Sequence, residues 1–238
     1  MPLQGAVREG EVWGLPDTAG FHLLLFYNKE LIDSPPLDTE QLVEVAQRFT
    51  GDDMWGLGVN SYDPLWVVPW LAAYGGWLTD ENGRPTLNTP AMEAALELYQ
   101  GWQQPPAPIA PLADHTEMAE QFFQGQIPMM IDGDWSLMAL KRSGMLNWGV
   151  APLPALKQEQ GSQAAAPLVL ARYWAANRQT AGDRASATAV FLEYITRPER
   201  QLDWTAHFGL LPTRREALDD PTLTTDPLLR VSARRRAA

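Results

Sequence analysis

Short apolar segments alternate with helical segments along most of the 238-residue chain. The apolar segments are typical of strands and lie at residues 21–32, 54–61, 127–131 and 167–176. The helical segments carry apolar residues at a spacing of three and four, and lie at 39–49, 63–76, 89–104, 116–123 and 183–209. Alternation of this kind predicts an α/β fold, in which helices cover the faces of a sheet.

The helix expected at residues 63–76 has clear end signals. Asp63 can cap its first turn, Pro64 suits the first helical position, and Gly75 and Gly76 can end it. Pro69 lies inside this segment, and proline lacks a backbone N–H and crowds the preceding turn. We therefore expect a kink or a break at Pro69.

The other helical segments predict which residues face the core. In the segment 39–49 the apolar positions are Leu42, Val45, Ala46 and Phe49. In the segment 89–104, which Thr89 should cap, they are Met92, Ala95, Leu96 and Tyr99. Pro198 should divide the segment 183–209 into two helices. Residues 157–166 show no periodicity and are expected to form a surface loop.

Charge and composition exclude several classes of protein. The formal net charge of −11 argues against nucleic acid as a partner, because binding to phosphates needs clustered Lys and Arg. The absence of cysteine excludes disulfides, cysteine-bound zinc and cysteine nucleophiles. The first ten residues have no apolar core of a signal peptide. Either the protein stays inside the cell, or these residues are not the beginning of the natural protein.

No catalytic or phosphate-binding motif is present in the sequence, and the three histidines have no metal-ligand spacing, so we expect neither an enzyme nor a metal or cofactor site. One pair of residues leaves an alternative open. Asp132 and Asp134 flank a glycine after an apolar strand, and they could chelate a divalent cation in a metal-dependent, sugar-active enzyme. The competing interpretation is that Asp134 caps a helix that begins at Trp135.

Aromatic and acidic residues follow two of the predicted strands. Trp135 lies in the first turn of a helix after the strand 127–131, and Tyr62, Asp63 and Trp66 follow the strand 54–61. The carboxyl ends of strands form the ligand crevice in open α/β sheets. Indole rings can stack on sugar rings, and a carboxylate can accept hydrogen bonds from hydroxyl groups. These residues could therefore form a carbohydrate site, and the alternative of simple helix starts and core tryptophan packing stays open.

Several segments, in order along the chain, carry a resemblance to a known family. They are "VWGLPDTAG", "LLLFYNKELI", "PPLDTEQLVEVAQRF", "WLAAYGGWLTDENGRPTLNTPAMEAALELYQ", "AEQFFQGQIPMMIDGDWSL", "WGVAPLP" and "FLEYITRPERQLDWTAHFGLLPTRREAL". The chain resembles the extracellular solute-binding proteins of sugar ABC transporters, the maltose-binding-protein-like group, over residues 11–218.

The resemblance implies a fold of the type II periplasmic-binding-protein kind, with two α/β lobes that close on a carbohydrate and then dock on ABC permease subunits. It implies an oligosaccharide as the ligand. It implies no catalysis and an extracytoplasmic location, in the periplasm or anchored at the cell surface. The tryptophan of the "GDW" block typically stacks on sugar in this family, which supports Trp135. The resemblance places Tyr62, Asp63 and Trp66 among the ligand contacts, and Asp17 and Phe21 near the floor of the cleft.

The same resemblance predicts how the chain is divided. Residues 1–21 would be a remnant of the first lobe with a crossing segment, 22–165 the second lobe, and 166–238 partial first-lobe elements with a tail. Family members are longer at both ends, so Leu168, Val169, Leu170 and the helix faces around Phe191 and Leu202 are expected to be poorly covered or packed onto the remaining lobe. Half a cleft should bind sugar weakly or undetectably. A half-length interaction module that pairs with a separate first lobe is a further alternative.

Overall fold

The computed structural model describes residues 5–51, 54–104, 109–112, 115–144, 147–226 and 229–231. These residues divide into two compact units. Unit 1 consists of Met1–His22, Leu137–Ala139 and Val169–Ala238, and unit 2 consists of Leu23–Ser136 and Leu140–Leu168. Each unit has its own sheet, and each is described by itself.

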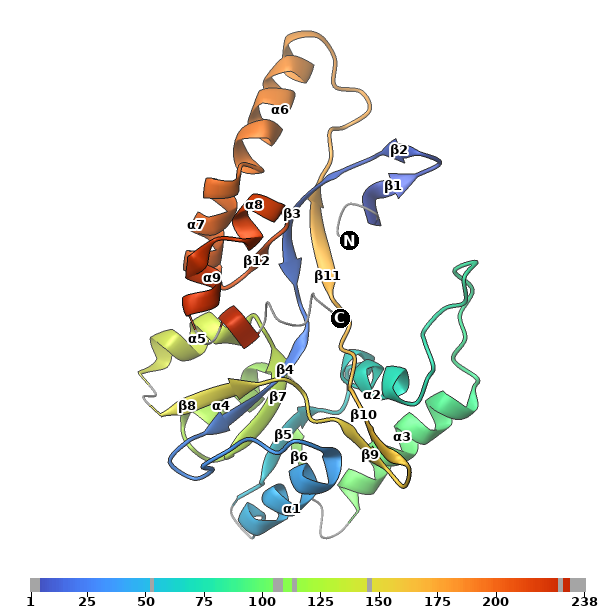
Figure 1. Cartoon of the computed structure of the whole chain (residues 1–238), viewed down its shortest axis with the longest axis vertical. Coiled ribbons are helices and arrows are strands. Elements are labelled where there is room, and N and C mark those ends of the chain that lie inside the picture. Colours follow the sequence, from blue (N-terminus) through green and yellow to red (C-terminus); the bar gives the residue numbers. More distant parts are fainter. Residues whose placement is uncertain are drawn as a thin grey trace. The chain divides into compact units, whose positions relative to one another are not determined.

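Unit 2 is built on a five-stranded sheet with the order β6-β5-β7-β4-β8 (Figure 1). The strands are β4 (Leu23–Asn28), β5 (Leu57–Asn60), β6 (Ile109–Leu112), β7 (Met129–Gly133) and β8 (Trp148–Ala151). β5 runs parallel to β6 and β7, whereas β4 is antiparallel to β7 and β8. All residues of β4 and β7 are buried. Their nearly continuous apolar sequences are typical of central strands that are covered on both faces.

The helices of unit 2 begin where the sequence signals predict. They are α1 (Thr39–Phe49), the 3₁₀ helix η2 (Pro64–Trp66), α2 (Val68–Ala73), α3 (Pro90–Gln103) and α4 (His115–Phe123). The hydroxyl of Thr89 accepts a hydrogen bond of 3.3 Å from the backbone N–H of Met92 and so caps α3. The predicted break near Pro69 is confirmed, because η2 ends before α2 begins and Pro69 lies in the first turn of α2.

One predicted helix face is partly wrong. α1 buries Leu42, Val45 and Ala46 as expected, but α3 buries Ala95, Tyr99 and Trp102, while Leu96 is 52% exposed. The spacing i, i+4, i+7 from Ala95 puts Tyr99 and Trp102 on one side of the helix. Leu96 lies about 100° further around the axis, so it turns away from the core.

Two further expectations are corrected. Residues 157–166 are not an irregular loop, because β9 (Leu156–Gln158) and β10 (Gly161–Gln163) form an antiparallel hairpin. Its mostly exposed strands are polar on both sides, so no period-two pattern marks them. The helix after β7 begins at Ser136, one residue later than expected. α5 (Ser136–Ser143) has Trp135 at its N-cap position without a side-chain capping bond, and Asp134 is buried.

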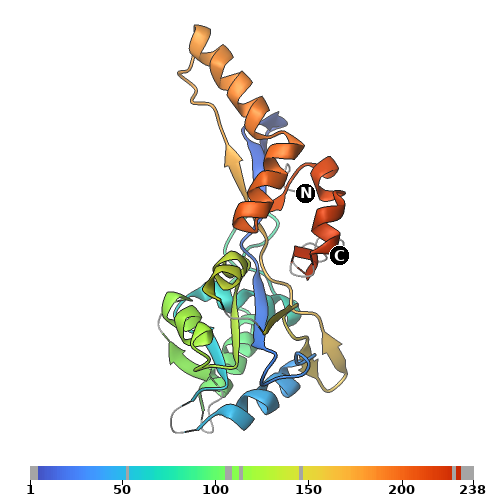
Figure 2. The ribbon, with the colours of Figure 1, turned by 90° about the vertical axis from the view of Figure 1, so that its left-hand side faces the viewer.

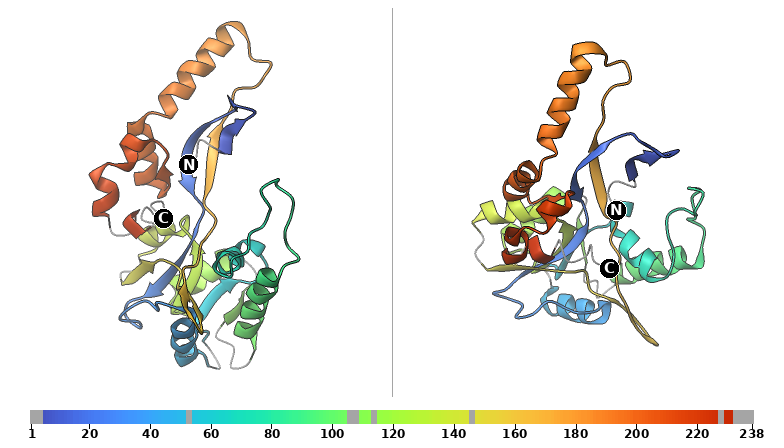
Figure 3. Two further views of the ribbon diagram at one scale, coloured as in Figure 1. Left: turned by 45° about the vertical axis from the view of Figure 1, so that its right-hand side comes forward. Right: turned by 45° about the horizontal axis from the view of Figure 1, so that its top comes forward.

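Unit 1 contains a three-stranded antiparallel sheet with the order β11-β3-β12. Its strands are β3 (Leu15–Gly20), β11 (Leu170–Trp174) and β12 (Leu211–Pro212), and β1 (Val7–Arg8) with β2 (Glu11–Val12) forms a separate hairpin. β3 and β11 lie side by side in both views of Figure 3. The helices are α6 (Gly182–Ile195), α7 (Pro198–Phe208), α8 (Arg215–Leu218) and α9 (Pro221–Thr225), and the predicted break before Pro198 is confirmed.

A buried amide holds α7 to the segment after β12. The Gln201 side chain has no exposed surface, and its Oε1 accepts hydrogen bonds of 2.9 Å from the backbone N–H groups of Thr213 and Arg214. Its Nε2 donates to the Thr213 hydroxyl at 3.0 Å. Unit 1 is therefore held together partly by polar contacts around one side chain.

Apolar residues of unit 1 are poorly covered, as predicted. Leu170 is 44% exposed, Phe191 is 50% exposed, Val169 is also exposed and Leu202 is half-buried. Leu168, the last residue of unit 2, is half-buried as well. None of the helices within the described residues has the length and apolar character needed to cross a lipid bilayer.

Candidate functional site

The carboxyl ends of three strands meet at one edge of the unit 2 sheet. β6, β5 and β7 are parallel neighbours, and Val59 of β5 pairs with Ile131 of β7. The segment 61–66 follows β5, Trp135 follows β7, and His115 opens α4 after β6. We call this region the strand-end site. The two aromatic segments that the sequence singled out therefore share a sheet edge.

The turn after β5 is held by side-chain acceptors. Oδ1 of Asn60 accepts hydrogen bonds from the backbone N–H groups of Tyr62 and Asp63 at 3.1 and 3.2 Å. Oδ1 of Asp63 accepts from the N–H of Leu65 at 2.9 Å, which caps η2. The turn leaves Tyr62 75% exposed and Asp63 exposed, so a phenol and a carboxylate face solvent on a fixed backbone.

Trp66 is buried, and the prediction that its ring stacks on a ligand is wrong. The residue is 2% exposed, and its indole N–H donates to the carbonyl of Ile131 at 2.6 Å. The hydroxyl of Tyr99 donates to the Trp66 carbonyl at 2.7 Å. Trp66 thus joins η2 to β7, and its ring meets Trp135 edge-on at 6.2 Å between centroids and 67° between planes.

Trp135 is half-buried between two aromatic neighbours. In addition to Trp66, the His115 ring meets it edge-on, with centroids 6.3 Å apart and planes at 78°. A glycine at position 133 is required by this arrangement, because a Cβ there would overlap the six-membered ring of Trp135. The indole is therefore supported on its sides while part of it remains accessible.

Asp132 is a buried carboxyl group at the end of β7. It is fully buried and accepts a hydrogen bond of 2.5 Å from the hydroxyl of Ser136. Burial raises the pKa of Asp132 from 3.8 to about 6, because the charged form loses its hydration. The Ser136 hydroxyl, the backbone N–H of Gly133 and the nearby His115 act against this rise in pKa.

The metal-dependent enzyme hypothesis gains nothing from this geometry. Asp132 and Asp134 are both buried, and the Asp132 carboxylate already receives the Ser136 hydroxyl. The described part of the chain contains no group of three or more His, Cys, Asp or Glu side chains that could hold a metal ion.

Asp17 and Phe21, which the sequence placed near a cleft floor, belong to unit 1. Asp17 is buried on β3, where it accepts a hydrogen bond from the Thr18 hydroxyl at 2.9 Å and lies 3.8 Å from Nε of Arg172. Phe21 is half-buried and has a positive φ of 58°. They are not part of the strand-end site of unit 2, and their role in ligand binding stays a prediction.

His115 is the member of the site that sequence reasoning missed. The three histidines were judged by metal-ligand spacing, and they have none. The usable signal was its position at the start of a helix that follows a strand, the same position that pointed to Trp135.

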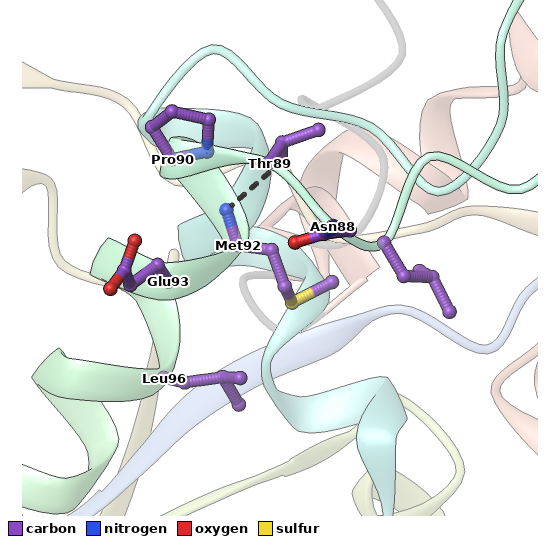
Figure 4. A pocket seen from close by; sticks show the side chains of 7 residues that line it. Asn88, Thr89, Pro90, Met92, Glu93 and Leu96 are labelled. Carbon is purple, nitrogen blue, oxygen red and sulfur yellow. Dashed lines mark hydrogen bonds between the residues drawn. The ribbon is translucent and has the colours of Figure 1, made fainter.

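A separate hollow of about 500 Å³ lies at the start of α3 (Figure 4). It is lined by Leu87, Asn88, Thr89, Pro90, Met92, Glu93 and Leu96. Figure 4 shows Met92 and Leu96 on the same side of the helix, with the Thr89 cap at its beginning. None of these residues belongs to the strand-end site.

Comparison with known proteins identifies the relatives of the chain. The family described as bacterial extracellular solute-binding protein matches residues 3–231. The maltotriose-binding protein of Pyrococcus abyssi (strain GE5 / Orsay) is 26% identical over 230 residues, which are 93% of this chain and 48% of that protein. The chain thus spans about half the length of this curated relative.

Solved structures share the fold. The maltose/maltodextrin-binding domain MalE from Bdellovibrio bacteriovorus, bound to maltotriose, has a TM-score of 0.85 and 27% identity over 100% of this chain and 63% of its own. The Thermus thermophilus maltotriose-binding protein, also bound with maltotriose, has a TM-score of 0.81 and 20% identity over 98% of this chain and 62% of its own. The fold is the type II periplasmic-binding-protein-like α/β fold that the sequence predicted.

Proposed function

Because the chain belongs to the family of bacterial extracellular solute-binding proteins, we propose that it binds an oligosaccharide of the maltodextrin class as the substrate-binding component of an ABC importer. The observation that carries this proposal is the half-buried indole of Trp135, held edge-on by Trp66 and His115 at the carboxyl ends of parallel strands. The ligand class is supported by one relative that is named a maltotriose-binding protein and by another whose structure is bound to maltotriose.

In the proposed binding mode the accessible part of Trp135 stacks on the apolar face of a sugar ring. The Asp63 carboxylate accepts hydrogen bonds from sugar hydroxyls, and the exposed Tyr62 offers a second aromatic surface and a phenol. Trp66 acts through Trp135, because its own ring is buried. Binding makes and breaks no covalent bond, so neither a cofactor nor a metal is invoked.

We further propose that residues 22–165 act as the second lobe and that the segments 1–21 and 166–238 contribute to the first. Asp17 and Phe21 would then supply contacts from the first lobe. A ligand that contacts both lobes binds the closed form more tightly than the open form and so stabilises it. A permease that recognises the closed form can then distinguish loaded from empty protein. Delivery to ABC permease subunits and an extracytoplasmic location, in the periplasm or at the cell surface, belong to the same proposal.

The affinity of this chain for sugar should be low. A dissociation constant near 1 mM corresponds to about 4 kcal/mol, which a single stacked ring with a few exposed hydrogen bonds can supply. A micromolar constant needs about 8 kcal/mol, and that requires contacts from both lobes.

Calorimetric titration with maltotriose, with spermidine as a non-sugar control, tests the proposal. We expect weak binding of maltotriose that Trp135→Ala abolishes and Trp135→Tyr partly restores. Trp77→Ala is the matched control, because Trp77 is an exposed tryptophan of unit 2 outside the strand-end site. Binding of maltotriose that survives Trp135→Ala, or binding of spermidine alone, would overturn the proposal.

A further inference from the structure

The carboxyl group of Asp132 takes no part in the proposed sugar contacts, yet it closes the turn that carries Trp135. Asp132 lies near the end of β7, and its Oδ2 accepts the 2.5 Å hydrogen bond from the hydroxyl of Ser136, the first residue of α5. Trp135 lies between these two residues in the sequence. The bond therefore ties the end of the strand to the start of the helix and holds the short turn that carries the indole.

This carboxyl group is buried and only partly satisfied. Asp132 has no exposed surface, and its Oδ1 accepts no hydrogen bond of normal geometry from the residues that the structure describes. A charge at this position has no access to solvent, so its stability depends on the few polar groups around it. The group is therefore suited to exchange a proton at a higher pH than an exposed aspartate does.

Two members of the strand-end site, His115 and Trp135, interact with this carboxyl group. α4 lies against β7, and both are drawn in yellow-green in Figure 2. His115 opens α4 and meets the Trp135 ring edge-on, with centroids 6.3 Å apart. Both side chains stabilise the negative charge on Asp132, His115 by electrostatic attraction. Because interaction free energies are reciprocal, the carboxylate in turn favours the positions of these two rings.

Other ionisable groups lie on or next to the elements around β7. α5 carries Lys141 and Arg142, both exposed in its last turn. The remaining ionisable residues of α4, of β4 and of the segments beside these strands are His22, Tyr27, Asp63, Glu117, Glu120 and Asp134. Among the described residues the electrostatic effect on the charge of Asp132 comes from His115. Asp134 is buried directly before Trp135, so a test must distinguish it from Asp132.

We propose that Asp132 is a positioning residue for Trp135, and that its ionised carboxylate fixes the turn 132–136 and makes sugar binding at the strand-end site dependent on pH. This inference rests on the proposed function, in which Trp135 stacks on the sugar.

Protonation of Asp132 weakens the hold on the indole in two ways. It replaces the charge-assisted hydrogen bond from Ser136 by a neutral one of about half the strength, and it removes the attraction to His115. Trp135 is then less firmly placed and stacks less well on a sugar ring. Burial raises the pKa of Asp132 to about 6, so the change falls between pH 5 and pH 7.

The first arm of the test uses no sugar and follows the indole resonance of Trp135 in ¹H–¹⁵N spectra from pH 5 to pH 7.5. We expect a step near pH 6 in the wild type and in the control Asp134→Asn. His115→Phe keeps a ring beside Trp135 and removes the imidazole, so the step should remain and move to higher pH. Ser136→Ala should also move the step to higher pH, because the hydroxyl favours the charged form. Adding Asp132→Asn to His115→Phe should abolish the step.

The second arm measures the dissociation constant of maltotriose from the same resonance. If binding requires the carboxylate, the affinity of the wild type should fall about tenfold between pH 7 and pH 5, while that of Asp132→Asn stays constant. Equal wild-type affinity at the two pH values, or a step that persists in the double variant, would overturn this inference and leave the proposed function intact. Absence of maltotriose binding at both pH values would instead overturn the proposed function, and the pH dependence with it.

Discussion

Unit 1 and unit 2 each contain a strand that the sequence predicts from an apolar segment, yet the two strands have opposite surroundings. All residues of β4 are buried, whereas none of β11 is. β4 has a strand on each side, but β11 pairs with β3 alone among the described strands. An apolar sequence therefore indicates that a strand is suited to burial, but the neighbouring strands and helices decide whether it is buried.

The largest expected effect on stability comes from truncating one phenylalanine in each unit, which tests this contrast. Phe26→Ala on β4 should lower the free energy of unfolding by about 3–5 kcal/mol, because it empties a fully buried site. Phe191→Ala on α6, where the ring is half exposed, should cost less than about 1 kcal/mol. Urea unfolding followed by circular dichroism measures both. Equal costs would show that the two units are covered alike.

The buried Asp132 predicts a pH dependence that belongs to unit 2. Its pKa is raised to about 6 in the folded protein, above 3.8, so folding favours the protonated carboxyl. This contribution is fully present below pH 3.8 and is lost as the pH rises through 6, which amounts to about 3 kcal/mol.

Unfolding of the wild type and of Asp132→Asn should be compared between pH 4 and pH 7. As the pH rises, the free energy of unfolding of the variant should increase relative to that of the wild type, because asparagine carries no charge to bury. A difference that does not vary with pH would mean that Asp132 is not buried as described.

In unit 1 the largest expected effect of a polar residue is at Gln201. Gln201→Ala leaves the backbone N–H groups of Thr213 and Arg214 without their buried acceptor, at a cost of about 2 kcal/mol. Gln158→Ala on the half-buried β9 is the control and should cost less than about 0.5 kcal/mol. Hydrogen exchange should localise the loss of protection to β12 and α8, and protection that is unaltered there would refute the role given to this amide.

Gly133→Ala should have a modest effect on stability and a clear effect on the site. The added methyl overlaps the Trp135 ring, which can turn outward, so we expect a cost of about 1–2 kcal/mol. Tryptophan fluorescence should shift to longer wavelength as the indole becomes more exposed. An unshifted spectrum together with unchanged maltotriose binding would show that the ring does not depend on this glycine.

Features with local causes were predictable from the sequence. The Thr89 and Asp63 caps, the break before Pro198 and the buried face of α1 all follow from side chains within one turn of the feature. The hairpin 156–163 was missed because its strands are polar on both sides. The Trp66 error has a different cause, since burial of that ring depends on the distant Ile131 and Tyr99.

The location of the strand-end site was predictable from the sequence, but the roles of its individual residues were not. The position of Trp135 and of Tyr62 and Asp63 after strands was enough to place them at one edge, because parallel strands end together. Which ring faces solvent and which supports it is set by packing between η2, β7 and α4, and no spacing in the sequence reports that.

The most direct test is the indole resonance of Trp135 in a two-dimensional ¹H–¹⁵N spectrum during titration with maltotriose, assigned by its disappearance in Trp135→Phe. The account predicts a saturable shift of this resonance while that of the buried Trp70 in the unit 2 core stays in place. A Trp135 resonance that remains fixed at saturating maltotriose, or moves no more than that of Trp70, would contradict it.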